Sequence, residues 1–428
     1  MIKLISAAKP LKGSISLPPD KSIAQRAALF ALLSESTSTI SNYPEAEDPQ
    51  TALSCIGMLG AEVIPDSSEI EIKGVGRDGL TLSGDIIDCG NSGTVMRLLS
   101  GILAGSGVQA TLIGDASLSS RPMKRIMDPL SRMGAEITSA DGGYPPLHLN
   151  RKGPLKPMRY TLPVASAQLK SCILLAGLFG DDVTEVVEPV PCRNHTETML
   201  RLPVDHQNGH TVISSYRGLE LPSQNLVIPG DFSAAAFWLV AATIVDGSDL
   251  MLPATGMNPT RNVAIDILKR MGADITIRNI RTEGAEPVAD LQVRSTELRA
   301  VTIRPEEVPV AIDELPILSV AMAFADGTSR ITGAEELRYK ESDRLSAMGT
   351  ILENAGIRVE VRKDGLIIQG RSGKPGKSTM HDSMNDHRIA MSAAILSLKT
   401  DGVSEIRNAG AASVSYPDFW SHLDSVAH

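Results

Sequence analysis

The segment Arg132-Met133-Gly134-Ala135-Glu136-Ile137 decides the fold, because similar segments recur along the chain. The other copies are Met58-Leu59-Gly60-Ala61-Glu62-Val63, Arg270-Met271-Gly272-Ala273-Asp274-Ile275 and, more loosely, Leu352–Val359. In each copy the glycine follows a helical pattern and precedes alternating apolar residues. Such a glycine ends a helix in a left-handed cap before a strand begins. The segment therefore marks a structural unit that the chain repeats.

The spacing of these glycines predicts how many units there are. The intervals are 74, 138 and 84 residues (60 to 134, 134 to 272 and 272 to 356). Because 138 residues hold two units of 69, we expect a hidden copy near Met199–Val204. Units of roughly 70–85 residues fit about six times into 428 residues and exceed the roughly 20–45 residues of a solenoid repeat. The sequence predicts an α+β fold of six small layers, arranged as two lobes of three.

The composition excludes several classes of protein. Hydrophobic residues make up 42% and charged residues 21% of the 428 residues, which is typical of a globular protein and not of a disordered or fibrous one. The 50 acidic and 41 basic residues leave a net charge of −9, so no overall field attracts nucleic acid or an anionic membrane. Aromatic residues are only 3%, too few for base-stacking platforms. An anionic substrate must therefore meet a local cluster of Lys and Arg.

Cysteine and histidine usage indicates a reduced, metal-free protein. The chain has 4 cysteines without C-x-x-C spacing, and its 8 histidines show no metal-binding motif. The longest apolar run, Ala234–Val245, is 12 residues long, against the roughly 20 needed to cross a bilayer. The N-terminal residues lack the pattern of a signal peptide. We expect a cytoplasmic protein with no metal site and no membrane or nucleic-acid partner.

Two nucleotide-binding motifs are only superficially present. Gly74–Gly79 matches G-x-G-x-x-G, but the alternating segment Leu80–Gly84 follows where a dinucleotide site needs a helix, so we expect a hairpin. Gly370–Ser378 resembles a P-loop, but its spacing is one residue too long and Pro375 removes an amide. Neither motif predicts a nucleotide site.

One candidate anion site lies at the start of a predicted helix near the N-terminus. In Pro19-Asp20-Lys21-Ser22 a turn ends and a helix begins, which places Lys21 and Ser22 at a helix N-terminus. Free amides and the helix dipole favour an anion there, and Arg26 lies about one turn further on. The alternative is a capped helix that carries surface charges.

Two further stretches share this arrangement. In Gly90-Asn91-Ser92-Gly93-Thr94, small residues let backbone amides approach a ligand, and Arg121 is held ahead of Pro122 further along the chain. In Ser166-Ala167-Gln168 a hydroxyl and an amide precede an apolar helix, although Ser166 can equally be a simple N-cap.

The second half of the chain supplies paired carboxylates and cations. Asp313 and Glu314 are adjacent and precede an apolar helix. Lys340 and Arg344 are four residues apart, so we expect them on one face of a helix, with Glu341 beside Arg344. Cations next to carboxylates suit an anionic substrate that undergoes proton transfer, although a solvated charge ladder gives the same pattern. Asp386-His387-Arg388 places another Arg at a helix start.

Together these motifs, in this order, resemble the EPSP synthase (3-phosphoshikimate 1-carboxyvinyltransferase) family. The resemblance covers essentially the whole chain. It implies the two-lobed enolpyruvyl transferase fold, in which each lobe has three βαβαββ units around a pseudo-threefold axis. It also implies that one lobe is discontinuous, formed by residues 1–19 and 233–428, and that residues 20–232 form the other.

The resemblance implies transfer of the enolpyruvyl group of phosphoenolpyruvate to the 5-hydroxyl of shikimate 3-phosphate, through a tetrahedral intermediate that releases phosphate. Asp313 would be the base, Glu341 the proton donor, and Lys21 would share in proton transfer. The residues implied for shikimate 3-phosphate are Lys21, Ser22, Arg26, Ser166, Gln168, Asp313 and Lys340. Those implied for phosphoenolpyruvate are Lys21, Gly93, Arg121, Gln168, Arg344 and Arg388. The resemblance implies no cofactor, and a monomer.

Some positions depart from the family pattern. Pro19 replaces a usual Gly and Gln25 a usual His, and neither change removes a charged contact. Val414 stands where one branch of the family has a Lys. Gly93 is retained, which implies binding of the inhibitor glyphosate, while Leu98 replaces a frequent Pro and leaves the degree of sensitivity open.

Two alternative functions compete with this one. A UDP-N-acetylglucosamine enolpyruvyl transferase would need a loop cysteine as acid, and the corresponding stretch Asp115–Arg121 has none. A non-catalytic phosphometabolite-binding protein would have no use for the paired carboxylates Asp313 and Glu341.

Overall fold

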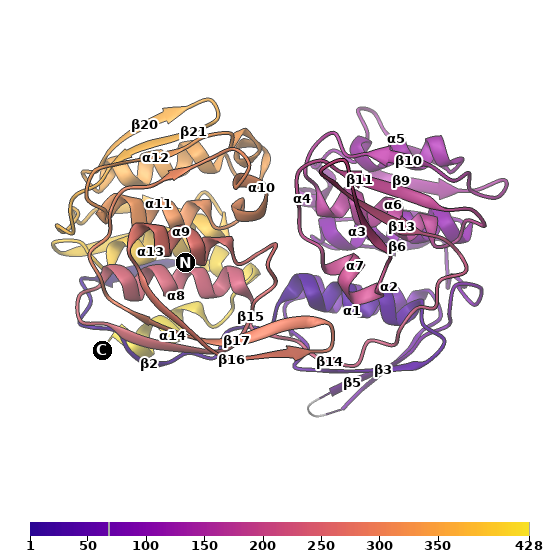
Figure 1. Ribbon diagram of the computed structural model, residues 1–428, viewed down its shortest axis with the longest axis horizontal. Coiled ribbons are helices and arrows are strands. Elements are labelled where there is room, and N and C mark those ends of the chain that lie inside the picture. Colours follow the sequence, from indigo (N-terminus) through magenta and orange to yellow (C-terminus); the bar gives the residue numbers. More distant parts are fainter. Residues whose placement is uncertain (67–68, 428) are drawn as a thin grey trace. The chain divides into compact units, whose positions relative to one another are not determined.

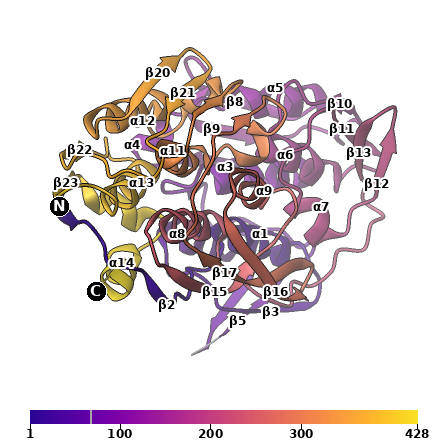
Figure 2. The same ribbon diagram turned by 60° about the vertical axis from the view of Figure 1, so that its left-hand side comes forward.

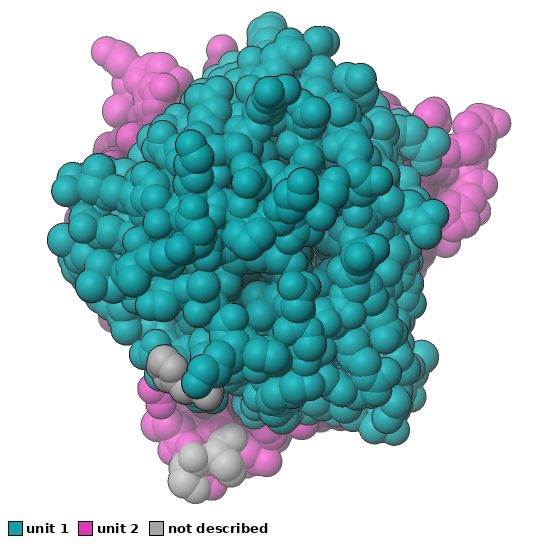
Figure 3. Space-filling view, turned by 90° about the vertical axis from the view of Figure 1, so that its left-hand side faces the viewer, with its two compact units in different colours: residues 1–18, 229–281, 287–428 teal, residues 19–228, 282–286 magenta. Residues whose placement is uncertain are grey.

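The computed structural model describes residues 1–66 and 69–427 (Figure 1). The chain divides into two compact units (Figure 3). Unit 1 consists of Met1–Pro18, Pro229–Arg281 and Pro287–His428, and unit 2 of Pro19–Ile228 and Thr282–Glu286. The short segment Thr282–Glu286 spans the turn between strands β16 (Asp274–Glu283) and β17 (Glu286–Arg294).

Unit 2 contains three four-stranded sheets of the same design, with the orders β14-β3-β5-β4, β6-β7-β9-β8 and β10-β11-β13-β12. In each sheet the first two strands are parallel and the remaining pairs are antiparallel. The strands are β3 (Thr37–Ser41), β4 (Glu62–Pro65), β5 (Glu69–Lys73), β6 (Ile86–Asp88), β7 (Ala110–Ile113), β8 (Glu136–Ala140), β9 (Tyr144–Asn150), β10 (Arg159–Thr161), β11 (Thr184–Glu188), β12 (Val204–Gln207), β13 (His210–Ser215) and β14 (Leu226–Val227).

Unit 1 repeats this design in the sheets β18-β19-β21-β20 and β16-β17-β15-β2, and in the shorter sheet β1-β23-β22. The strands are β1 (Ile2–Ser6), β2 (Lys12–Ser14), β15 (Asp249–Gly256), β16, β17, β18 (Thr302–Ile303), β19 (Thr328–Ile331), β20 (Arg358–Arg362), β21 (Gly365–Gln369), β22 (Met380–Asp382) and β23 (Val403–Arg407). Five four-stranded sheets of one design and one three-stranded sheet confirm the predicted six-fold repeat and the fold of two lobes with three units each.

Each unit has buried helices at its centre, surrounded by the sheets and the outer helices (Figures 1 and 2). In α8 every one of the 13 residues is buried, which explains its continuous apolar sequence. An outer helix such as α5 buries only one stripe of residues. The inner helices are α1 (Lys21–Leu32), α3 (Gly93–Ser106), α6 (Ala167–Gly177), α8 (Phe232–Ile244), α11 (Leu315–Phe324) and α13 (His387–Ser397).

The other helices are shorter or more exposed. They are α2 (Glu47–Met58), α4 (Ala116–Ser119), α5 (Lys124–Met133), α7 (His195–Leu200), α9 (Val263–Met271), α10 (Val308–Ala311), η1 (Glu335–Tyr339), α12 (Arg344–Asn354), η2 (Ala409–Val414) and α14 (Phe419–Ala427). In unit 1 the two ends of the chain lie close together, and Lys3 pairs with Asp424 at 3.5 Å (Figure 2).

The repeated glycines have the predicted left-handed conformation at helix ends. Gly60, Gly134 and Gly272 have φ values of 103°, 105° and 103°, and Gly356 has 74°. The hidden copy is also confirmed, because Arg201 caps α7 with φ 52° at the position of the glycine. An arginine with positive φ is uncommon, which is why the copy is hard to see in the sequence.

The two nucleotide look-alikes do not form nucleotide sites. The segment Gly74–Gly79 forms a turn after β5, and the next regular element is β6. The predicted hairpin is wrong, because β6 pairs with β7 in the neighbouring sheet and not with β5. After Gly370 the chain turns and continues into β22 and not into the helix of a P-loop.

Within the described residues, the structure has no helix with the length and apolar character needed to span a bilayer. The same residues contain no group of three or more His, Cys, Asp or Glu side chains arranged to hold a metal ion. Cys55, Cys89, Cys172 and Cys192 are buried free thiols, as the sequence predicts.

Candidate active site

The six inner helices differ in how their N-termini are capped. In five of them the N-cap side chain accepts a hydrogen bond from a backbone N–H of the first turn. These caps are Asp20, Ser92, Ser166, Asp231 and Asp386. The exception is α11, where Glu314 makes no such bond and Pro316 follows near the helix start. The carboxylate of Glu314 therefore takes part in contacts other than a helix cap.

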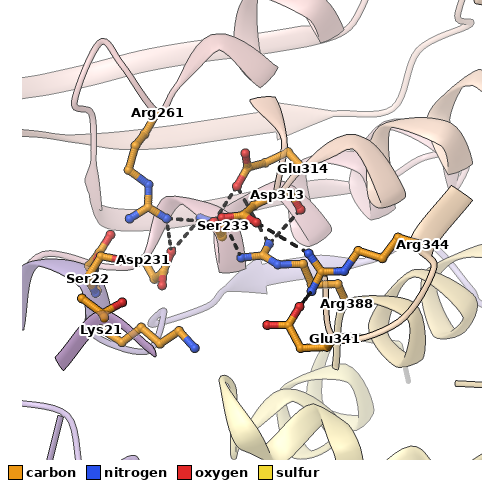
Figure 4. A network of polar contacts seen from close by, with 12 residues as sticks. Lys21, Ser22, Asp231, Ser233, Arg261, Asp313, Glu314, Glu341, Arg344 and Arg388 are labelled. Atoms are coloured by element: carbon orange, nitrogen blue, oxygen red, sulfur yellow. Dashed lines mark hydrogen bonds and ion pairs between the residues drawn. The ribbon is translucent and has the colours of Figure 1, made fainter. Parts of the chain in front are cut away.

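In unit 1, Arg344 is buried among carboxylates at the start of α12 (Figure 4). Its Nη2 donates to Glu341 Oε2 at 2.6 Å and its Nε to Asp386 Oδ2 at 2.8 Å, while Nη1 lies 3.6 Å from Asp313 Oδ1. Burial disfavours the charged guanidinium, but these carboxylates outweigh it and raise the pKa of Arg344. Arg344 is thus a permanent cation that links both candidate acid–base groups.

Arg388, in the first turn of α13, contacts both the backbone and the carboxylate of Asp313. Its Nη1 donates to the backbone carbonyl of Asp313 at 2.8 Å, and its Nη2 lies 3.5 Å from Asp313 Oδ2. Asp386 caps α13 by accepting from Arg388 N at 2.9 Å. Burial opposes ionisation of Asp386, yet the charge of Arg344 prevails and the pKa of Asp386 is lowered. Two arginines therefore contact the Asp313 carboxylate, which is partly accessible.

The predicted helix carrying Lys340 and Arg344 on one face is wrong. A 3₁₀ helix ends at Tyr339, Lys340 has an extended backbone, and α12 begins only at Arg344. The reason is Asp343, whose side chain accepts from Ser346 N and starts a new helix there. Lys340 nevertheless remains in the cluster. Burial lowers its pKa, while the charge of Asp313 acts in the opposite direction and that of Arg344 adds to the lowering.

Four residues of unit 1 that the sequence did not single out as site residues lie next to these groups and are hydrogen-bonded to one another. Arg261, which is buried, donates from Nη2 to Ser233 Oγ at 2.8 Å and to Asp231 Oδ1 at 3.1 Å. Ser233 in turn donates to Glu314 Oε1. Glu314 is almost fully buried, with 1% of its surface exposed. A hydrogen-bonded chain therefore runs from Arg261 to the start of α11.

In unit 2, Lys21 and Ser22 begin α1 as predicted. Lys21 Nζ lies 3.4 Å from Asp48 Oδ2. Arg26 is buried and donates from Nη1 to the carbonyl of Ser22 at 3.1 Å and from Nε to Thr196 Oγ1 at 3.1 Å. The predicted alternative of a capped helix is confirmed, because Asp20 accepts from Ser22 N at 2.8 Å and from Ile23 N at 3.0 Å. The role of Lys21, Ser22 and Arg26 in anion binding stays a prediction.

Gly93 begins α3 between two arginines. A Cβ atom built on Gly93 would lie 2.7 Å from Arg97 Nη1 and 3.4 Å from Arg121 Nη1. Arg121 is oriented by bonds from its Nη2 to Asn91 Oδ1 at 2.9 Å and to Ser117 Oγ at 3.1 Å. The predicted pair Gly93 and Arg121 is thus brought together within unit 2.

Gln168 is held in place by α3. Its Oε1 accepts from Arg97 Nη1 at 2.8 Å and its Nε2 donates to Thr94 Oγ1 at 2.9 Å. Ser166 caps α6 by accepting from Leu169 N at 3.4 Å. Arg97 was not predicted as a site residue, although its place one turn after Gly93 could have indicated it.

Unit 2 also contains a buried cluster of charged side chains around Lys170. Lys170 has no exposed surface and donates to Glu188 Oε1 at 2.9 Å and to Glu197 Oε1 at 2.6 Å. Burial lowers the pKa of Lys170, but the two carboxylates overcome this and the net shift is upward. Ser171, the neighbour of Lys170 in the chain, forms a hydrogen bond of 2.6 Å with the hydroxyl of Thr196. The same hydroxyl accepts from Arg26. The cluster therefore supports the position of Arg26.

Comparisons with known proteins agree on one family. A model described as EPSP synthase (3-phosphoshikimate 1-carboxyvinyltransferase) matches residues 5–423. The chain is 45% identical to 3-phosphoshikimate 1-carboxyvinyltransferase of Salinibacter ruber over 100% of both chains. It is 46% identical to the protein of that name in Thermosynechococcus vestitus, over 98% of this chain and 96% of the other.

Solved structures agree. An EPSP synthase from Acinetobacter baumannii is similar with a TM-score of 0.89 at 40% identity, covering 100% of this chain and 98% of the other. The enolpyruvyl transferase NikO from Streptomyces tendae is similar with a TM-score of 0.75 at 18% identity, covering 99% and 97%, which shows the shared fold alone.

Proposed function

The chain belongs to the EPSP synthase family, and on this premise we propose how its residues carry out the family reaction. The reaction transfers the enolpyruvyl group of phosphoenolpyruvate to the 5-hydroxyl of shikimate 3-phosphate and releases phosphate. The alternative acceptor, UDP-N-acetylglucosamine, is not favoured, because the full-length relatives are 3-phosphoshikimate 1-carboxyvinyltransferases.

Asp313 acts as the base that removes the proton of the 5-hydroxyl. The observation that supports this role most directly is that Arg344 Nη1 and Arg388 Nη2 lie 3.6 and 3.5 Å from its two carboxylate oxygens and so stabilise its charged form. Glu341, which accepts from Arg344 Nη2 at 2.6 Å, donates a proton to C3 of phosphoenolpyruvate. Two carboxylates contacted by different nitrogens of one guanidinium suit an addition that moves two protons.

Arg344 and Arg388 also bind phosphoenolpyruvate, together with Gly93, Arg121 and Gln168. Guanidinium groups suit this role because they form bidentate, charge-assisted bonds to carboxylate and phosphate. In unit 2 the orientation of Arg121 by Asn91 supports the role, since a fixed guanidinium loses little freedom on binding.

Shikimate 3-phosphate binds to the remaining predicted residues. These are Lys21, Ser22, Arg26, Ser166, Gln168, Asp313 and Lys340. The start of α1 supports phosphate binding through its side chains, because Lys21, Ser22 and Arg26 lie there while the Asp20 carboxylate accepts from the amides of Ser22 and Ile23. Lys21, which also contacts phosphoenolpyruvate, shares in proton transfer. The enzyme works as a cytoplasmic monomer without a cofactor.

Phosphate release from purified protein tests this proposal. We expect release only when shikimate 3-phosphate and phosphoenolpyruvate are both present. Asp313→Asn should abolish turnover while shikimate 3-phosphate still binds, whereas Asp246→Asn, at a residue whose side chain is 90% exposed, should have no effect. Release with UDP-N-acetylglucosamine in place of shikimate 3-phosphate would contradict the acceptor, and full activity of Asp313→Asn would contradict the base.

A further inference from the structure

Glu314 is a buried carboxylate at a helix start where it does not cap the helix. Burial of a carboxylate is costly unless specific partners stabilise it. Its partners here are Ser233, which donates to Oε1, and Arg388, whose Nη1 lies 4.0 Å from the same oxygen (Figure 4). We propose that Glu314 is a positioning residue that shares Arg388 with Asp313 and so keeps the Asp313 carboxylate basic. This inference rests on the proposed roles of Asp313 and Arg388.

The direction of the Ser233 hydrogen bond is determined by Arg261. Ser233 Oγ accepts from Arg261 Nη2 at 2.8 Å, and a guanidinium can only donate. The hydroxyl proton of Ser233 is therefore free to point at Glu314 Oε1. Asp231 Oδ1 accepts a second hydrogen bond from the same Nη2 atom at 3.1 Å, which fixes the position of Arg261. This chain of bonds holds the Glu314 carboxylate in one orientation.

Arg388 is held between the two neighbouring carboxylates. Its Nη1 donates to the backbone carbonyl of Asp313 at 2.8 Å and lies 4.0 Å from Glu314 Oε1, while its Nη2 lies 3.5 Å from Asp313 Oδ2. The contact with Asp313 Oδ2 is longer than a direct charge-assisted hydrogen bond of roughly 2.7–2.9 Å. If Glu314 lost its charge, Arg388 would shift fully onto Asp313.

Such a shift has two consequences for the reaction. A closer cation lowers the pKa of a carboxylate, and a lower pKa makes a weaker base. An arginine bound more tightly to Asp313 is also less available to phosphoenolpyruvate. Other charged groups near Asp313 include Arg344 on α12, and Lys340 and Glu341 in the segment before it. Asp386 at the start of α13 binds the same Arg344. These groups are unchanged by a substitution at Glu314.

The test compares Glu314→Gln with wild type in the phosphate-release assay across pH. Gln keeps the shape and an acceptor for Ser233 but has no charge for Arg388. We expect KM for phosphoenolpyruvate to rise about fivefold to tenfold, and the acidic limb of kcat/KM to move down by roughly 0.5–1 unit. KM for shikimate 3-phosphate should change less than twofold. Ser233→Ala should raise KM for phosphoenolpyruvate more weakly, because the charge of Glu314 remains.

Glu360→Gln, the same change at an exposed strand residue paired with Arg362, serves as control. If Glu314→Gln leaves both the pH limb and KM for phosphoenolpyruvate unchanged while wild type is active, the inference is wrong and the proposed function stands. A merely structural role would lower Tm and the active fraction without moving the pH limb, and this result also overturns the inference. If wild type itself releases no phosphate, the proposed function fails and the inference fails with it.

Discussion

Protonation of His381 should destabilise unit 1 as the pH falls. His381 lies on β22, its side chain is 0% exposed, and neither ring nitrogen has a hydrogen-bond partner among the described residues. Burial lowers its pKa from 6.5 to about 4. Between these two pKa values His381 is protonated in the unfolded chain but neutral in the folded unit. Its contribution to the free energy of unfolding is therefore complete above pH 6.5 and is lost as the pH falls toward 4.

The magnitude follows from these two pKa values. Between pH 7.5 and pH 5.0, linkage at this one residue gives a loss of about 2 kcal/mol in the free energy of unfolding. His381→Leu removes the titrating group and keeps a similar volume. Leu also leaves no unpaired polar atom, so at pH 7.5 we expect a change of less than about 1.5 kcal/mol.

The assay is urea unfolding followed by tryptophan fluorescence at both pH values. The chain has 2 tryptophans, Trp238 and Trp420, and both lie in unit 1 with His381, so the signal reports on the unit concerned. His381→Leu should lose about 2 kcal/mol less than wild type on acidification. The control is His210→Leu, at an exposed residue of unit 2. An equal loss in wild type and His381→Leu would refute the reasoning.

Three further predictions concern the candidate site. Lys170→Met leaves two buried glutamates without their cation and should lower the free energy of unfolding by roughly 3–5 kcal/mol, measured as a fall in Tm. Because the cluster supports Arg26 through Thr196, KM for shikimate 3-phosphate should also rise, and an unchanged Tm would contradict the prediction. Gly93→Ala places a Cβ 2.7 Å from Arg97 Nη1, so KM for phosphoenolpyruvate and the inhibition constant of glyphosate should both rise severalfold, and unchanged constants would mean that Arg97 moves away freely. Arg344→Lys loses the fork that binds Glu341 and Asp386 and should raise KM for phosphoenolpyruvate about tenfold or more in steady-state kinetics, whereas wild-type kinetics would show that charge alone suffices.

Local chemistry explains why much of the fold could be predicted from the sequence. The glycines that end helices with positive φ and the caps Asp20, Ser166 and Asp231 act within a few residues, so their signal lies in short segments. The repeat of these segments then indicates six units. The same locality explains two errors: Asp343 starts a new helix and separates Lys340 from Arg344, and β6 pairs with another sheet and not with β5.

The order of the motifs also located the candidate residues, because each helix start carries its own polar side chains. What a sequence cannot contain is the set of partners that orient them. Arg26 meets Thr196 across 170 positions of sequence, and Ser233 meets Glu314 across 81. These contacts depend on how separate repeats pack around the inner helices, and packing is a property of the whole unit. The sequence by itself determined the repeat, the helix starts and the charged groups they carry, while only the tertiary structure decided which groups share a proton or a cation.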